Sequence, residues 1–317
     1  SRKDIFATCS DIISSSMILQ FMFVFLVLNI ILNGTGFAFN VKQYHKKISS
    51  LMLSCSLNIA DGLMAVYLCA ILASHLVFEG DIAYVVLYWK RSFVCKMSGV
   101  IIMTSVMASN LTTMLNALNR FIVIVWKPFQ RYGLTSLQSM TGLLLLWCMS
   151  IVIPLLSAAH SDIINSACII LGGSLYLPYA VIYIIVNCLL FMCVTFFYVQ
   201  VVHKVYASGR IQKSQRKVKQ VAGRLGAVIL TNFLASMTIT LLSVLSFCIY
   251  VPASLESMLA FWLFALNSCV NPVLNTLLTD KILRAVVSYL SISNITKSIR
   301  FLITFIQRMY KTFKEYS

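Results

Sequence analysis

One carboxylate lies inside a long apolar stretch of this chain and is the first candidate for chemistry. Asp61 is the only acid in the middle of a run that is apolar enough for a membrane, since Glu256 lies at the very start of the run 254–278. A charge at that depth is costly and by default marks a functional or ion site. Polar residues expected at a similar depth are Asn33, Ser109, Asn267, Ser268 and Asn271. Oxygen donors around one carboxylate suit a small hard cation, here sodium. The alternative is an Asp61 that is protonated or hydrogen-bonded to its neighbours without an ion.

A thiol and a guanidinium mark the two ends of the apolar run 92–122. Arg120 follows Cys95 by 25 residues, which corresponds to about 37 Å of helix at ~1.5 Å per residue. That length exceeds the ~30 Å hydrocarbon core of a bilayer. The run is therefore expected to span a membrane, with Cys95 at one face and Arg120 at the other.

The elements that must position these residues are seven apolar runs in a chain that is 60% hydrophobic and 11% charged. Each is about long enough to span, and helices satisfy their own backbone groups in lipid. After the last run, residues 281–290 have the pattern of a short amphipathic helix on the inner membrane surface. We expect an all-α membrane protein with an extracellular segment 1–16, a seven-helix domain 17–278 and a cytoplasmic amphipathic helix and tail 279–317. The runs are 17–41, 48–73, 92–122, 136–158, 174–202, 221–249 and 254–278.

Basic residues predict the orientation. Of the 25 Lys and Arg residues, 20 fall on the face that holds loops 42–47, 123–135 and 203–220 and the tail. Because positive charge stays inside, the N-terminus is expected outside a plasma membrane. The net charge of +16 then indicates membrane topology and attraction to anionic lipid, and nucleic acid is not expected as a partner. The basic loop 203–220 could also be a docking surface.

Two cysteines are expected on the outer face, Cys95 and Cys168, in a compartment that favours disulfides. A bridge between them would tie the second outer loop across the top of the run 92–122. Cys9 is also outside and would pair beyond this chain. Trp89, in the first outer loop, either anchors at the membrane interface or packs over the Cys95 end.

The order and spacing of several residues resemble the rhodopsin-like (class A) G-protein-coupled receptors. The residues that match the motifs of this family are Asn33, Leu57–Asp61, Cys95, Asn119-Arg120-Phe121, Trp147, Cys168 and Asn271-Pro272. Further runs are similar to the relaxin-receptor and glycoprotein-hormone-receptor branch, whose members carry a leucine-rich-repeat ectodomain that binds a protein hormone. These runs are Ala60–Leu68, Phe121–Phe129, Thr231–Phe233 and Leu266–Leu274, together with Asn187 at the place of the usual helix-five proline.

The resemblance implies a receptor for a peptide or protein hormone that acts on a heterotrimeric G protein. Asn119, Arg120 and Phe121 would serve coupling, and Arg120 would contact the tail of the G-protein α subunit. Asn271, Pro272 and Asn275 would form the helix-seven motif. The alternative for Arg120 is snorkelling to a lipid phosphate.

The chain also departs from the family at positions that matter for switching. Asn119 replaces the acid that restrains the arginine, which should loosen the resting state. The other changed positions should impair the switch, so a basally active receptor and a poorly coupled one both stay open. They are Asn187, Asn232, Ser236, Thr238 and Asn275.

Other function classes fit less well. A non-signalling decoy or scavenging receptor of the same fold is the main alternative, because of these departures. A transporter or channel is remote, since the chain has no internal repeat and one membrane acid. The four histidines show no metal-ligand spacing, so an enzyme is not expected.

Overall fold

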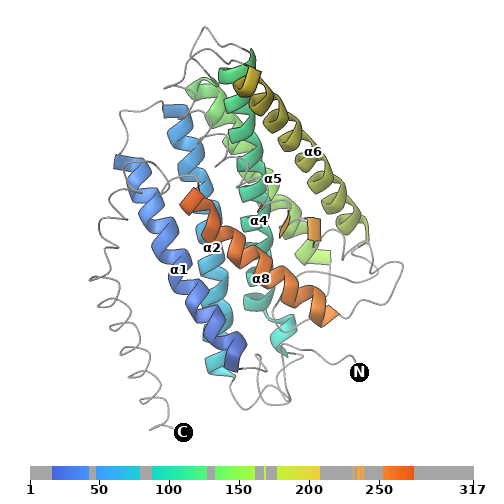
Figure 1. Ribbon diagram of the computed structural model, residues 1–317. Helices are drawn as coiled ribbons and strands as arrows, with labels where there is room; N and C mark the ends of the chain where they lie inside the picture. The colour runs from blue at the N-terminus through green and yellow to red at the C-terminus, as the bar shows by residue number, and fades with distance from the viewer. Residues whose placement is uncertain are drawn as a thin grey trace, which may run out of the picture. The chain divides into compact units, whose positions relative to one another are not determined.

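The structure is a computed structural model of the 317-residue chain (Figure 1). It describes residues 16–42, 48–78, 88–126, 133–160, 168, 177–207, 231, 234–235, 237–238 and 253–274. All of them lie in one compact unit, Ser1–Thr276. The expected amphipathic helix at 281–290 and Cys9 lie outside the described residues.

Within the described residues, five helices are long and apolar enough to cross a membrane. A sixth, α8 (Ala253–Pro272), packs against α1 and α2. The expected all-α membrane bundle is confirmed, and the helices begin within three residues of the predicted runs. Of the run 221–249, only residues 231, 234–235 and 237–238 are described, and they are helical. The five are α1 (Ser16–Lys42), α2 (Ile48–Val77), α4 (Phe93–Phe121), α5 (Ser136–His160) and α6 (Leu177–Ala207).

Helix α4 is the centre of the bundle. It contacts α2, α5 and α6, and 18 of its 29 residues are buried. Its first turn is capped by Ser92, whose side-chain oxygen accepts a hydrogen bond from the Cys95 amide at 3.2 Å. Its C-terminal end continues directly into the π-helical segment η1 (Ile122–Trp126). Such widened turns are frequent at functional sites.

Trp89 packs over the N-terminal end of α4, where Cys95 lies, rather than standing at the lipid interface. Its side chain is only 2% exposed and belongs to the same apolar cluster as Cys95 and Cys168. The ring of Phe78 lies against it, with centroids 5.7 Å apart. Of the two alternatives for Trp89, anchoring at the membrane interface or packing over the Cys95 end, its burial supports packing.

Helix α5 is positioned by two sets of hydrogen bonds. At its start, Thr135 and Gln138 bond to each other's backbone amides, which is a capping box. Further along, the indole nitrogen of Trp147 donates to the hydroxyl of Ser56 on α2 at 3.0 Å. Inside a bilayer such bonds hold helices together where the hydrophobic effect cannot.

Candidate functional site

The expected disulfide joins Cys95 at the start of α4 to Cys168. The two Cα atoms are 5.2 Å apart, and both residues are fully buried in the apolar cluster around Trp89. Because 73 residues separate them, the bridge links a segment that is distant in sequence to the first turn of α4.

Asp61 lies on α2 and faces the interior of the bundle. It is 0% exposed. The side chains of Ser109 on α4 and Asn271 on α8 face its carboxylate, and the Asn271 amide donates to the Ser109 hydroxyl at 3.2 Å. The structure thus brings three of the six predicted polar residues together from three helices.

Two of the other three predicted residues, Asn33 and Ser268, meet where α8 packs against α1. The Asn33 amide donates to the backbone carbonyls of Ser268 at 3.1 Å and of Asn29 at 3.2 Å. The backbone of Ser268, not its side chain, makes this contact. Asn267, which precedes Ser268 in the sequence, is also buried, with a relative exposure of 8%.

The buried atoms left unpaired in these six residues are all oxygens. Five acceptors complete no hydrogen bond of normal geometry within the described part of the chain: both carboxylate oxygens of Asp61 and the amide oxygens of Asn33, Asn267 and Asn271. The side chains of Ser109 and Asn271 approach the Asp61 carboxylate without completing such a bond. An oxygen of this kind is satisfied by a hydrogen-bond donor or by a hard cation.

Asn119 and Arg120, at the C-terminal end of α4, make no hydrogen bond to each other in the part of the chain that the structure describes. The Asn119 amide oxygen accepts from the Leu134 backbone amide at 2.9 Å, and its nitrogen donates to the Ser50 hydroxyl at 3.4 Å. Both halves of the Asn119 amide are therefore used by the loop before α5 and by α2. The Nε of Arg120 is buried and has no hydrogen-bond partner among the described residues.

Phe121, the third residue of the triplet, packs into an aromatic cluster on α6. Its ring centroid is 5.2 Å from that of Phe197 and 6.2 Å from that of Phe196. On the other side it meets Trp126 of η1 at 6.5 Å. Phe121 thus links the inner end of α4 to α6, a role that the motif alone did not indicate.

A polar pair that sequence reasoning missed joins the middle of α4 to α6. The Asn110 amide donates to the amide oxygen of Asn187 at 3.1 Å. Asn187 is 4% exposed and stands where the family has a proline. The sequence shows an asparagine in each of two apolar runs, but it does not show that these two side chains face each other.

The remaining motif residues are only partly described. Pro272 is the last residue of α8 and is buried. Thr238 bonds to the backbone carbonyl of Leu234 at 2.6 Å, one turn earlier. Asn232, Ser236 and Asn275 lie outside the described residues.

Comparison with known proteins agrees with this arrangement. The chain is 27% identical to mouse (Mus musculus) relaxin receptor 1 over 283 residues, which is 83% of this chain and 37% of the receptor. It is 23% identical to human relaxin receptor 2 (82% and 37% covered) and 25% identical to the G-protein coupled receptor GRL101 of Lymnaea stagnalis (88% and 26% covered). The chain spans little more than a third of the relaxin receptors it matches. The family model of the seven-transmembrane receptors of the rhodopsin family matches residues 32–274, so this chain belongs to that family.

Proposed function

We propose that this chain is the membrane-spanning signalling part of a G-protein-coupled receptor for a relaxin-like or related peptide or protein hormone. The similarity to relaxin receptors 1 and 2 supports the ligand class. The placement of 20 of 25 basic residues on one face supports a plasma-membrane orientation with the N-terminus outside. Hormone binding would shift the bundle between two helix packings by its differential affinity for them.

The observation that carries the signalling proposal is the state of Arg120. A guanidinium presents five N–H donors in a rigid fork. Its sequence neighbour Asn119 is committed to Leu134 and Ser50. Arg120 is therefore available to backbone carbonyls of a segment that docks at the inner end of α4, and the tail of a G-protein α subunit is the proposed partner.

Basal signalling tests this proposal. The 317-residue chain, expressed without hormone, should activate a G protein above the empty-vector level, because no carboxylate at position 119 restrains Arg120. Arg120→Ala should abolish the signal at equal surface levels. Arg91→Ala, an exposed arginine beyond the other end of α4, is the matched control and should leave it intact.

A second candidate function is a receptor that binds hormone without signalling. The bond between Asn110 and Asn187 favours it, since α4 and α6 cannot separate at this depth without breaking that bond. This candidate is supported if G-protein activation by the wild-type chain stays at the empty-vector level even when a hormone-competent ectodomain is fused before Ser1.

Sodium is the proposed allosteric ion at Asp61, with the unpaired oxygens of Asp61 and Asn271 as its ligands. An ion that binds one packing stabilises it by RT ln(1 + [Na⁺]/Kd), and the resting packing is the one proposed to bind. Replacing choline chloride by sodium chloride at constant ionic strength should raise the thermal stability of the purified chain. Asp61→Asn should remove that rise; if the sodium effect survives the substitution, the ion binds elsewhere.

A further inference from the structure

Three aromatic rings join α1 to α8 in a contact that plays no part in the function proposed above. The ring centroid of Trp262 on α8 lies 4.6 Å from that of Phe21 and 5.7 Å from that of Phe25, both on α1. The interplanar angles are 68° and 86°, so both pairs have the edge-to-face geometry that aromatic rings favour. We call these three residues the aromatic clamp. Lipid is as apolar as the helices, so fitted contacts of this kind must hold them together.

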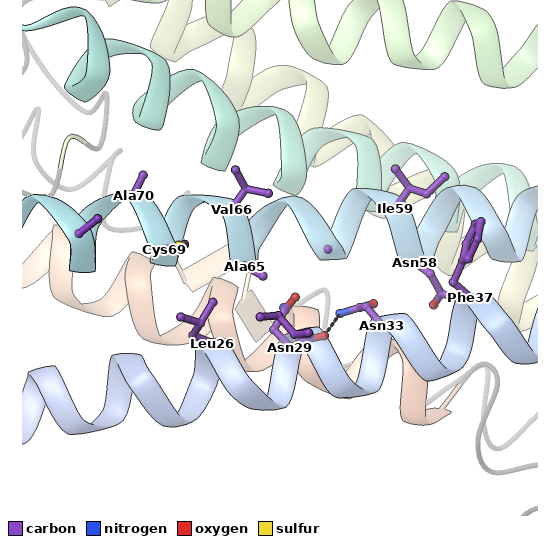
Figure 2. Close-up of a pocket in the computed structure, with 14 residues that line it drawn as sticks. Leu26, Asn29, Asn33, Phe37, Asn58, Ile59, Ala65, Val66, Cys69 and Ala70 are labelled. Atoms are coloured by element: carbon purple, nitrogen blue, oxygen red, sulfur yellow. Dashed lines mark hydrogen bonds between the residues drawn. The ribbon is translucent and has the colours of Figure 1, made fainter. Parts of the chain in front are cut away.

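Polar contacts continue the seam along α1. The Cys269 thiol donates to the Phe25 backbone carbonyl at 4.0 Å and lies beside the Asn29 side chain. The Asn33 amide donates to the Ser268 backbone carbonyl at 3.1 Å. Figure 2 shows Asn29 and Asn33 on α1, beside the groove that this helix forms with α2, with the bond from Asn33 to the Asn29 carbonyl dashed. Helix α1 therefore holds α8 by the aromatic clamp and, further along, by polar contacts.

The face of α8 that the clamp holds lies opposite the face that carries Asn271. Trp262 and Asn271 are nine residues apart, which is two and a half turns at ~3.6 residues per turn, so their side chains leave the helix in opposite directions. The Asn271 amide donates to the Ser109 hydroxyl at 3.2 Å, and both side chains face the Asp61 carboxylate. Rotation of α8 by about 20° would move the Asn271 Cα by about 0.8 Å. That shift is enough to break the bond, because a hydrogen bond does not extend beyond about 3.5 Å.

We propose that Trp262 is a positioning residue for the Asp61 site: the aromatic clamp fixes the rotation of α8 and thereby holds Asn271 against Ser109. The bond from Asn33 to the α8 backbone is a single point, about which α8 could turn or tilt. The clamp adds a second point, about 9 Å of helix away, so the two together set the orientation of α8 on α1. A displacement of α1 then reaches the Asp61 site through α8.

The clamp matters for signalling only if the Asp61 site acts as proposed above, whereas its effect on Asn271 is measurable without signalling. The measurement is unfolding of the purified chain in mixed micelles with increasing denaturing detergent. It is made in choline chloride, without sodium, hormone or G protein, for Trp262→Leu, Ser109→Ala and the double variant.

Coupling between Trp262 and Ser109 is the expected result. Ser109→Ala removes the acceptor of the Asn271 amide and so raises the unfolding constant of the wild-type chain. In Trp262→Leu the amide no longer reaches that acceptor, so the rise should be about threefold to eighteenfold smaller, the equivalent of an average to a very strong hydrogen bond between membrane helices. A Trp262 that only packs would instead act additively with Ser109, to within about twofold in the unfolding constant.

Further variants separate positioning from packing. Asn110→Leu is the matched control, because Asn110 follows Ser109 on α4 but bonds to Asn187 on α6. Trp262→Leu should leave the effect of Asn110→Leu unchanged. Trp262→Phe keeps an aromatic ring against α1 and should restore most of the effect of Ser109→Ala. If Trp262→Leu gives too little folded chain, Phe25→Leu removes the clamp from the α1 side and carries the same expectation.

The proposal is overturned if Ser109→Ala raises the unfolding constant by the same factor, within about twofold, with and without the Trp262 ring. It is overturned equally if the effect of Asn110→Leu shrinks as much as that of Ser109→Ala. A failure of sodium binding or of G-protein activation would contradict the proposed function instead, because the cycle contains neither the ion nor the G protein.

Discussion

The hydrogen bond between Asn110 and Asn187 offers a direct measure of how firmly α4 is held to α6. It replaces the helix-five proline of the family by a polar link at 3.1 Å, with Asn187 almost fully buried. The perturbation is a double-mutant cycle of Asn110→Leu, Asn187→Leu and the two together. Leucine keeps an apolar side chain of similar size and cannot donate or accept.

The expected coupling follows from measured helix contacts in membranes. Side-chain hydrogen bonds between membrane helices contribute about 0.6 kcal/mol on average and up to about 1.7 kcal/mol. Each single change also leaves one amide with an unmade bond, whereas the double change removes both partners. The double variant should therefore be less destabilised than the sum of the singles by about 0.6–1.7 kcal/mol.

The same energy acts on the balance between helix packings. If the bond exists in only one of two packings, its loss shifts their ratio by about threefold to eighteenfold. The assay is unfolding of the purified chain in mixed micelles with increasing denaturing detergent, for the four members of the cycle. Asn33→Leu with Asn187→Leu is the control cycle, because Asn33 bonds to the backbone of α8 instead.

Additivity of Asn110→Leu and Asn187→Leu within about 0.3–0.5 kcal/mol would refute the reasoning. The two amides would then not stabilise each other, and the fit of α4 to α6 would rest on apolar packing alone. A coupling as large in the control cycle would refute it equally, because the effect would not be specific to this pair.

Two further predictions concern the ends of α4. In the chain-entropy model, the Cys95–Cys168 bridge stabilises the folded chain by about 4 kcal/mol because it closes a loop in the unfolded chain. Replacing either of these cysteines with Ser should therefore lower surface expression by more than Cys148→Ser does. Equal surface levels in the three variants would contradict this. Gly133→Ala places a methyl group against the Asn119 side-chain oxygen and should destabilise the chain by about 1 kcal/mol through the lost loop contact. Gly62→Ala, in open space, is its control in the same unfolding assay and should change stability far less.

Features that depend on composition along the chain could be predicted from sequence. The run 92–122 became α4 at Phe93–Phe121, and the pairing of Cys95 with Cys168 followed from orientation. Hydropathy and the distribution of basic residues determine both, because the bilayer imposes length and sidedness. The approximate ends of the described helices could therefore be predicted before any contact was known.

Features that depend on how helices are rotated against one another could not be predicted. Asn110 and Asn187 are 77 residues apart, and nothing local shows that they face each other. The same holds for Asn119, whose partners come from α2 and from the loop before α5. Asp61 was identified because one buried acid is conspicuous in an apolar run, whereas asparagines are common enough there that their partners must be seen.

The use of an amide at position 119 has a consequence for how this receptor responds to protons. A carboxyl group next to Arg120 would bind a proton more readily in one helix packing than in the other, and the balance of packings would then vary with pH. The Asn119 amide takes up no proton, and its two bonds to Leu134 and Ser50 are the same in acid and in neutral solution. A change in pH therefore meets no titrating group at position 119 through which to alter this end of α4.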